Sequence, residues 1–198
     1  LNTISEKIDS LIWEPVNQKI DSGLLYSAWL EAKQLAKIPI LETKSNEIMK
    51  QVDKLKNFID DKKYFENVLE QEQSYMNAFS LLFNQLLLQK SATSIEKEIW
   101  LEKARLIEQM GKDKNHYSRL SSHRCYDHSI RSCQEYYYQL LSSGEYKMAF
   151  SIAEVLLYFD KQSSNPDYML ARAAAGLGNK KRCEKSLKDA IKKGLLFN

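Results

Sequence analysis

The sequence predicts an all-α fold, and three observations support this prediction. Glycine and proline, the two residues least compatible with a helix interior, occur only six and three times in 198 residues. Apolar residues recur at helical spacing along most of the chain. A pattern of helix, glycine turn and helix also repeats with an offset of 34 residues, from Gly144 to Gly178. We therefore expect a series of helical hairpins, with a long helical section in the centre.

Residues 1–39 are predicted to form an N-terminal helical hairpin. Its first helix covers residues 5–21, where Pro15 should kink or divide it, because proline removes a backbone donor and clashes with the preceding turn. Gly23 then ends this helix, and Ala28 follows five residues later, as an alanine does after the first glycine of the repeat. The hairpin is therefore a candidate degenerate copy of the same unit.

Residues 40–115 are predicted to form a central section of long helices. An apolar stripe over residues 43–59 predicts one amphipathic helix. The charged run Asp60–Lys63 is either a turn or a solvated stretch of a longer helix. The helix over residues 64–88 becomes apolar on nearly all sides, so we expect its C-terminal half to be buried in a bundle. Thr93, with a Glu three residues later, fits a capping box for the next helix.

Residues 116–198 are predicted to form two repeats and a C-terminal cap. Asn165 is expected to cap one helix, with a proline at the first helical position. Ala149, Ala171 and Cys183 are small residues at positions where two antiparallel helices need a close approach, so we expect them to be packed. The four expected helices cover residues 116–143, 145–160, 166–177 and 180–193.

The repeated residues resemble the tetratricopeptide pattern. Gly144, Tyr146 and Ala149, followed 34 residues later by Gly178 and Cys183, match its glycine, aromatic and small positions. The resemblance covers residues 130–194 and implies a right-handed α-α superhelix of helical hairpins. The last of these repeats also resembles the terminal repeat of many bacterial cell-envelope proteins. This resemblance implies an extracytoplasmic protein, while the sequence itself leaves a cytoplasmic location open.

The family binds peptides or protein segments in a groove lined by the first helix of each repeat. The resemblance therefore implies a protein or peptide partner for this chain. A simpler interpretation is that the corresponding side chains only cover a packed surface. The residues carried over to the groove are Arg131, Gln134 and Tyr138 from one helix, and Asn165, Tyr168 and Arg172 from the next.

Two hypotheses for the function arise from the resemblance. In the first, the protein is a non-enzymatic helical-repeat scaffold that binds its partner on a concave face. In the second, the chain is an accessory helical domain of a larger extracytoplasmic enzyme whose catalytic part lies outside residues 1–198. The chain begins at Leu1 rather than Met, and this start fits both a removed signal peptide and a longer protein.

Composition and spacing argue against several other classes of function. The net charge of +3 is spread along the chain, so the sequence predicts no nucleic-acid partner. The sequence contains no run of 18 apolar residues, so we expect no membrane-spanning segment. We expect no cofactor, because phosphate-binding glycine motifs are absent. The spacing of His116, His123 and His128 around Cys125 and Cys133 does not suit a metal site or a catalytic pair, so we predict no enzyme activity.

Overall fold

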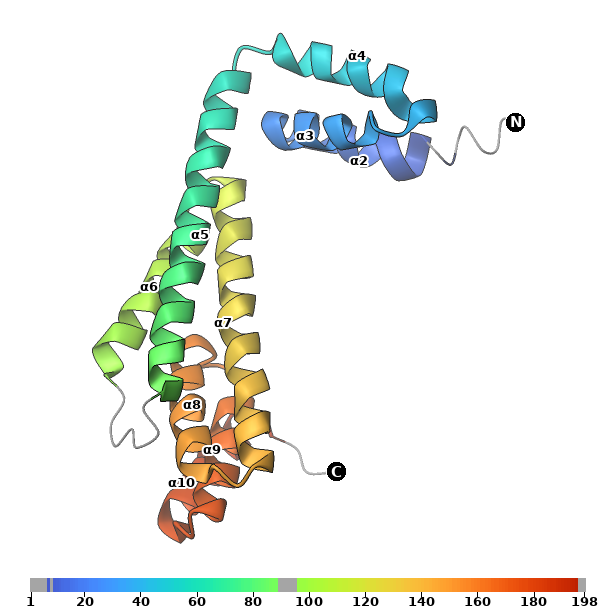
Figure 1. Cartoon of the computed structure of the whole chain (residues 1–198). Coiled ribbons are helices and arrows are strands. Elements are labelled where there is room, and N and C mark those ends of the chain that lie inside the picture. Colours follow the sequence, from blue (N-terminus) through green and yellow to red (C-terminus); the bar gives the residue numbers. More distant parts are fainter. Residues whose placement is uncertain (1–6, 8, 89–95, 196–198) are drawn as a thin grey trace. The chain divides into compact units, whose positions relative to one another are not determined.

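The computed structural model describes residue 7 and the ranges 9–88 and 96–195 (Figure 1). These residues are helical over most of their length, and no β-strand occurs among them. The predicted all-α fold class is therefore confirmed. The chain divides into two compact units, residues 1–69 and residues 70–198, and each unit has a hydrophobic core of its own.

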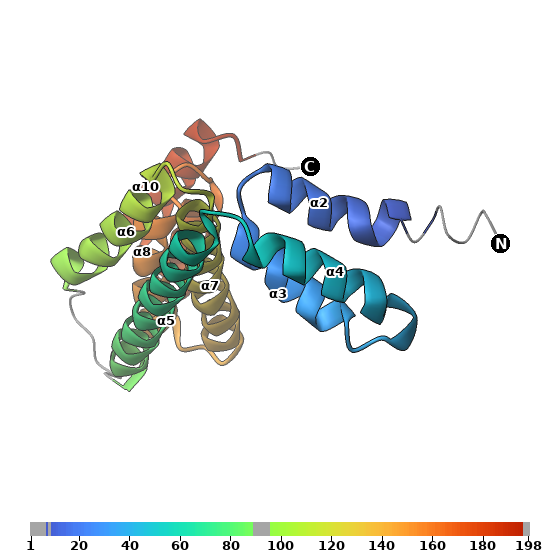
Figure 2. The ribbon, with the colours of Figure 1, turned by 90° about the horizontal axis from the view of Figure 1, so that it is seen from above.

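In the described part of the N-terminal unit, the helices α2, α3 and α4 pack side by side (Figures 1 and 2). Pro15 lies in the first turn of α2, directly after a π-helical turn, so it divides the predicted first helix as expected. Val16 and Ala28 are fully buried in the core between these helices. The elements are the π-turn Asp9–Trp13, α2 (Glu14–Asp21), α3 (Leu25–Leu35), a 3₁₀ turn Pro39–Leu41, α4 (Glu42–Asp53) and the start of α5 (Phe58–Leu88).

The predicted single helix over residues 43–59 is wrong, because α4 ends at Asp53. The amide of Leu55 donates to the carbonyl of Val52 at 3.0 Å, and the short i to i+3 bonds of this turn tighten the chain before α5 begins. Phe58 then packs its ring against Tyr26, with 5.9 Å between the ring centroids. Aromatic packing in the N-terminal unit therefore overrides the continuous apolar stripe.

The charged run Asp60–Lys63 belongs to the first turns of α5 and is not a turn between helices. Asp61 also has a structural role. Its carboxylate accepts a hydrogen bond of 2.8 Å from the backbone N–H of Tyr26, in the first turn of α3. The first amides of a helix lack partners within the helix, so Asp61 caps α3 from a neighbouring helix.

The C-terminal unit begins within α5, and its described residues form five further helices. Asn165 is the first residue of α9 and not its cap, because Ser163 Oγ accepts a hydrogen bond from its amide and the helix starts one residue early. The predicted capping box at Thr93 lies outside the described residues. The helices are α6 (Lys97–Lys112), α7 (His116–Ser142), α8 (Tyr146–Phe159), α9 (Asn165–Gly176) and α10 (Lys180–Lys192).

The C-terminal half of α5 buries only one face, contrary to the prediction. Phe79 is fully buried, and its ring contacts Trp100 of α6 and Phe159 of α8, with centroid distances of 5.7 and 5.6 Å. By contrast, Leu81 and Leu88 are 63% and 81% exposed. The helix therefore contributes to the core from one side, although its sequence is apolar around most of its circumference.

Helices α5 and α7 run parallel, and α6 returns antiparallel to α7. Tyr75 and Ser129 form a side-chain hydrogen bond of 2.8 Å, and further along both helices the rings of Phe83 and Tyr136 are 5.3 Å apart. Residue numbers thus rise together in α5 and α7. In contrast, Ser122 Oγ of α7 donates to the carbonyl of Ile107 in α6, and Ser118 Oγ donates to the carbonyl of Met110. Residue numbers therefore rise in α7 as they fall in α6. The chain therefore alternates direction from helix to helix.

The two glycine turns of the predicted repeat have the same geometry. Gly144 and Gly178 have φ angles of +77° and +68°, which side chains with a Cβ rarely adopt. The amide after each glycine donates to a carbonyl five residues earlier, from Glu145 to Leu140 and from Asn179 to Ala174, at 2.9 Å in both cases. This pairing is the Schellman motif. The predicted glycine turns are therefore confirmed.

The small residues of the repeat are packed in two of the three predicted places. Ala149 is fully buried and Ala171 is 1% exposed. Cys183 is only half-buried, so its predicted burial is wrong. The reason is its position on α10, the last described helix, which packs mainly against α9 alone.

Candidate partner-binding surface

An open depression lies on the C-terminal unit where the end of α7, the start of α8 and the end of α9 meet. We call it the α7–α9 depression. Its lining combines aromatic rings, small residues and one guanidinium group, and most of these side chains are partly or fully exposed. The lining residues are Tyr138, Leu141, Ser142, Tyr146, Arg172, Ala175 and Gly176.

The depression is positioned by Tyr137, which holds α7 against α9. Its side chain is fully buried, and its hydroxyl donates a 2.6 Å hydrogen bond to the carbonyl of Met169. Burial raises the pKa of Tyr137 to about 12, and the positive charge of the nearby Arg172 offsets only part of this rise. Consecutive helical residues point about 100° apart. The next residue, Tyr138, is accordingly 48% exposed and lines the depression.

The structure brings together three of the six residues predicted for the groove. Tyr138 and Arg172 line the depression, and the Arg172 guanidinium lies 5.9 Å from the ring centroid of Tyr168. A cation over an aromatic face is a favourable contact. The other three predicted residues lie outside the depression: Arg131 is exposed, and Gln134 and Asn165 are half-buried.

Sequence reasoning missed the part of the depression that α8 contributes. Tyr146 matched the aromatic position of the repeat but was not predicted to be a site residue. Its ring packs so closely on Gly176 that a Cβ at this glycine would overlap the ring atoms. Gly176 therefore leaves the room that the Tyr146 ring occupies against the end of α9. The sequence feature that could have identified this contact is the aromatic position of the repeat, Tyr146, together with Gly176 at the end of the next helix.

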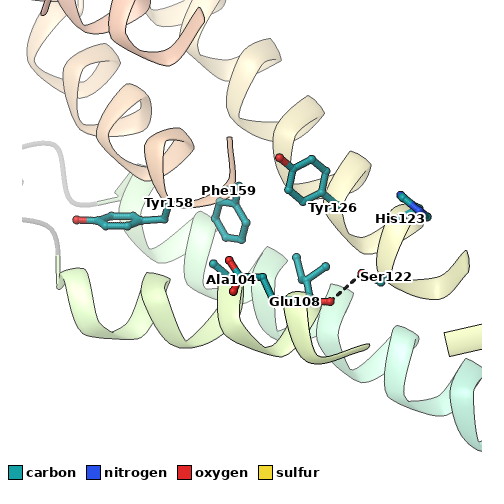
Figure 3. Close-up of a pocket in the computed structure, with 8 residues that line it drawn as sticks. Ala104, Glu108, Ser122, His123, Tyr126, Tyr158 and Phe159 are labelled. Carbon is teal, nitrogen blue, oxygen red and sulfur yellow. Dashed lines mark hydrogen bonds between the residues drawn. The ribbon is translucent and has the colours of Figure 1, made fainter. Parts of the chain in front are cut away.

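A second, more enclosed pocket lies between α6, α7 and α8, and we call it the α6–α8 pocket (Figure 3). Its volume is about 200 Å³. Its floor is apolar, whereas its rim carries polar groups that include one carboxylate and one imidazole. The lining residues are Ala104, Ile107, Glu108, Ser122, His123, Tyr126, Tyr158 and Phe159.

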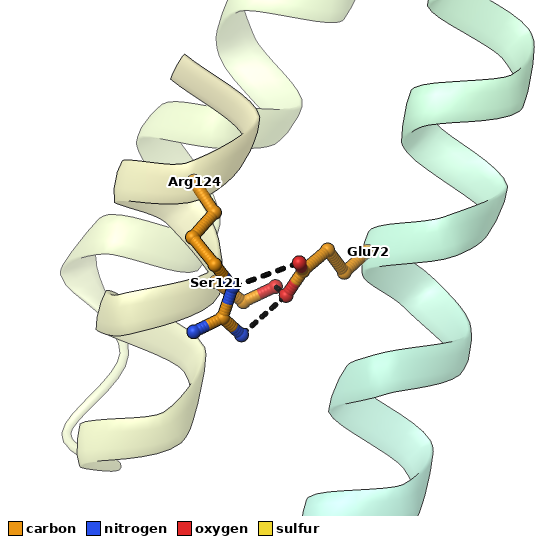
Figure 4. A network of polar contacts seen from close by, with 3 residues as sticks. All are labelled: Glu72, Ser121 and Arg124. Carbon is orange, nitrogen blue, oxygen red and sulfur yellow. Dashed lines mark hydrogen bonds and ion pairs between the residues drawn. The ribbon is translucent and has the colours of Figure 1, made fainter. Parts of the chain in front are cut away.

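A polar network joins α5 to α7 within the C-terminal unit (Figure 4). Glu72 accepts hydrogen bonds from Arg124 through both of its oxygens and from Ser121 Oγ at 2.6 Å. Burial by itself raises the pKa of Glu72, but the hydrogen bonds from Arg124 and Ser121 outweigh it and leave the pKa below its ordinary value. Both oxygens of Glu72 are thus engaged by side chains of α7, and this geometry is that of a structural clamp between two helices.

The histidine and cysteine cluster is dispersed in the structure. Cys125 and Cys133 are free, buried thiols. Burial raises the pKa of Cys125 to about 11, so little thiolate is present at neutral pH. His128 Nε2 lies 3.5 Å from Ser80 Oγ of α5. In the part of the chain that the structure describes, no three His, Cys, Asp or Glu side chains are placed to hold a metal ion.

The described residues define an all-helical protein of two units, and the C-terminal unit carries the α7–α9 depression and the α6–α8 pocket. No protein-family model, curated protein or solved structure matches the chain. Within residues 9–88 and 96–195, every helix is too short or too polar to span a lipid bilayer.

Proposed function

We propose that this protein is a non-enzymatic helical-repeat scaffold that binds a peptide or protein segment across α7 and α9. One observation carries the proposal. Tyr138 and Arg172 are 34 residues apart, so they occupy the same position in two successive hairpins, and both line the α7–α9 depression. A surface in which equivalent positions of neighbouring hairpins face one ligand is the usual binding surface of helical repeats.

The order of the helices supports a tetratricopeptide-like array. Helices α7 and α8 form one hairpin with a glycine turn, and α9 and α10 form a second hairpin with the same turn. Helices α5 and α6 precede them with the same alternation of direction, so the array would extend one hairpin further toward the N-terminus. A right-handed superhelix and a cell-envelope location are part of this proposal, on the strength of the repeat pattern.

The chemistry of the depression suits a peptide ligand. Tyrosine offers a large, rigid contact area with a polar tip, and arginine can donate two parallel hydrogen bonds to a carboxylate or a backbone carbonyl. Tyr138 and Arg172 present these groups at an open surface. Such residues are enriched among those that dominate binding energy at protein interfaces.

The proposal is tested by capture of a partner from a bacterial cell-envelope extract. The wild-type chain is compared with the triple variant Tyr138→Ala, Tyr168→Ala, Arg172→Ala, after circular dichroism has shown that both are folded. A matched control replaces Lys181, Lys185 and Lys188 by Ala on the exposed surface of α10. We expect a partner that the wild type and the control retain and the triple variant loses. Equal capture by all three proteins would contradict binding at this surface.

A further inference from the structure

The α6–α8 pocket combines an apolar floor with aromatic side chains from two helices. Ala104, Ile107 and Phe159 are buried beneath it. Tyr126 of α7 and Tyr158 of α8 line it from separate elements (Figure 3). Faces of aromatic rings carry partial negative charge and attract cations, more strongly where water is excluded. The pocket therefore offers both an apolar contact and a favourable environment for positive charge.

One carboxylate, that of Glu108, lines this pocket, and other carboxylates lie near its two tyrosines. Burial raises the pKa of Tyr126, and the nearby carboxylates of Asp160, Asp127 and Glu108 raise it further. Burial likewise raises the pKa of Tyr158, and the carboxylates of Glu154 and Glu98 raise it further. Both tyrosines thus lie near carboxylates of α6, α7 and α8, of which Glu108 and Glu154 are also paired with Lys161 and Arg182. The positive charge of a ligand would be complementary to this environment.

An ammonium group of the chain already lies beside the pocket. Lys161 Nζ is 3.5 Å from Glu108 Oε1, and both side chains are about half exposed. Exposed pairs of this kind are weak, because water screens them. A ligand cation can therefore compete with Lys161 for the carboxylate of Glu108.

We propose that the α6–α8 pocket binds an organic cation, an alkylammonium or guanidinium group carried on a short apolar stem. The stem would lie on the floor formed by Ala104, Ile107 and Phe159, and the charged head would lie between the two tyrosines and Glu108. The volume of about 200 Å³ is below the roughly 300–1,000 Å³ of pockets for drug-sized ligands. It suits a head group of the size found on lysine, arginine or a free amine.

This site is separate from the proposed peptide surface. The α7–α9 depression uses Tyr146 at the start of α8, whereas the α6–α8 pocket uses Tyr158 and Phe159 near the end of α8. A separation of 12 residues along a helix corresponds to about 18 Å. The inference therefore stands on its own contacts and does not depend on the proposed function.

The test measures binding of N-acetyl-arginine amide to the full chain, by calorimetry and by NMR. The probe of matched shape is N-acetyl-citrulline amide, which lacks the positive charge. We expect saturable binding of the arginine amide, NMR shift changes at Tyr126 and Tyr158, and an affinity at least about fivefold above that of the citrulline amide. No binding to the wild type, or equal affinity for both amides, would overturn the proposal.

Three variants separate the charge from a general effect on folding. Glu108→Gln should weaken binding of the arginine amide about two- to fivefold, because one carboxylate of the site is lost. Lys161→Ala should strengthen binding, because the competing ammonium is removed. Glu102 is an exposed acid elsewhere on α6, so Glu102→Gln should leave binding of the arginine amide unchanged. Unchanged binding by Glu108→Gln, or weaker binding by Lys161→Ala, would show that the cation does not bind in this pocket.

A second probe distinguishes the two sources of such a cation. Spermidine is titrated in parallel with the arginine amide. Tighter binding of spermidine would assign the pocket to free amines, and tighter binding of the arginine amide would assign it to the side chain of a peptide. Either result supports an organic cation as the ligand, provided that Glu108→Gln weakens the binding of the preferred probe.

Discussion

The N-terminal and C-terminal units use the same turn to close a hairpin. Gly23 has φ +76°, and the amide of Leu24 donates to the carbonyl of Lys19 at 2.8 Å, as in the turns at Gly144 and Gly178. In the N-terminal unit, too, a fully buried alanine, Ala28, follows the glycine by five residues. The local device that joins two antiparallel helices is therefore common to both units.

The units differ in the elements that come after the hairpin. In the C-terminal unit a second hairpin with the same turn comes next, and equivalent positions of the two line one depression. In the N-terminal unit a 3₁₀ turn and α4 come next, and the rings of Tyr26, Trp29, Phe58 and Phe65 pack together. A glycine turn is thus enough to make one hairpin, whereas a surface shared between hairpins requires that the turn be repeated.

The largest effect is expected where α7 is held against α9. Tyr137→Ala should destabilise the C-terminal unit by about 3–5 kcal/mol, because it removes a fully buried ring and its hydrogen bond to Met169. Tyr138→Ala, one residue further on, should change the free energy of unfolding by less than about 0.5 kcal/mol. Chemical denaturation measures both. Similar losses for the two variants would contradict the contact between the hairpins.

The second prediction concerns close approach between helices. Ala171→Leu should cost about 1–3 kcal/mol, because the added atoms have no room in the packed hairpin. Ala175→Leu on the exposed face of α9 is the matched control and should be nearly neutral. Ala28→Leu should destabilise the N-terminal unit in the same range. Thermal melting of all three variants checks this, and a neutral Ala171→Leu would refute the packing of the repeat.

The third prediction tests the turn that the units share. Gly23→Ala and Gly178→Ala should each cost about 1–2 kcal/mol, because a Cβ disfavours positive φ. Hydrogen exchange should show lower protection in residues 1–69 for the first variant and in residues 70–198 for the second. Lys180→Ala, beside the second turn, is the control. If either glycine variant matched the control, its turn would not require the left-handed conformation.

The smallest effect is expected at the clamp between α5 and α7. Glu72→Gln should lower the free energy of unfolding by about 1 kcal/mol at neutral pH. The loss is small because Arg124 is half exposed and water screens the ion pair. The pKa of Glu72 is lowered in the folded state, so its contribution is present above the unfolded pKa and lost as pH falls through the folded pKa. Denaturation of wild type and variant should therefore converge in acid. A gap that persists at low pH would contradict this.

Most of the fold can be predicted from local signals in the sequence. The helices that end at Gly23, Gly144 and Gly178 were predicted because glycine at a helix end reports a backbone conformation that other residues avoid. The break after Asp53 was missed, since no glycine or proline marks it and aromatic contacts of Phe58 determine it. Similarly, the exposure of Leu81 depends on where neighbouring helices lie, which the composition of α5 does not encode.

In the candidate sites, too, local sequence signals predicted some residues, and contacts between helices determined the others. The repeat offset placed Tyr138 and Arg172 at equivalent positions, and the structure places both on one depression. Tyr146 was missed because its place there depends on a contact with Gly176, on another helix. The α6–α8 pocket was also missed, because residues from three helices form it and no spacing along the chain brings them together.

The most direct test of the proposed binding surface places a photo-crosslinking amino acid at Tyr138, and at Leu106 as a control. Both side chains are exposed to a similar extent, 48% and 40%, but Leu106 lies on α6 outside the depression. Irradiation in cells should give a discrete adduct with a partner at position 138 and none at position 106. The same adducts at both positions, or none at position 138, would contradict a partner-binding surface across α7 and α9.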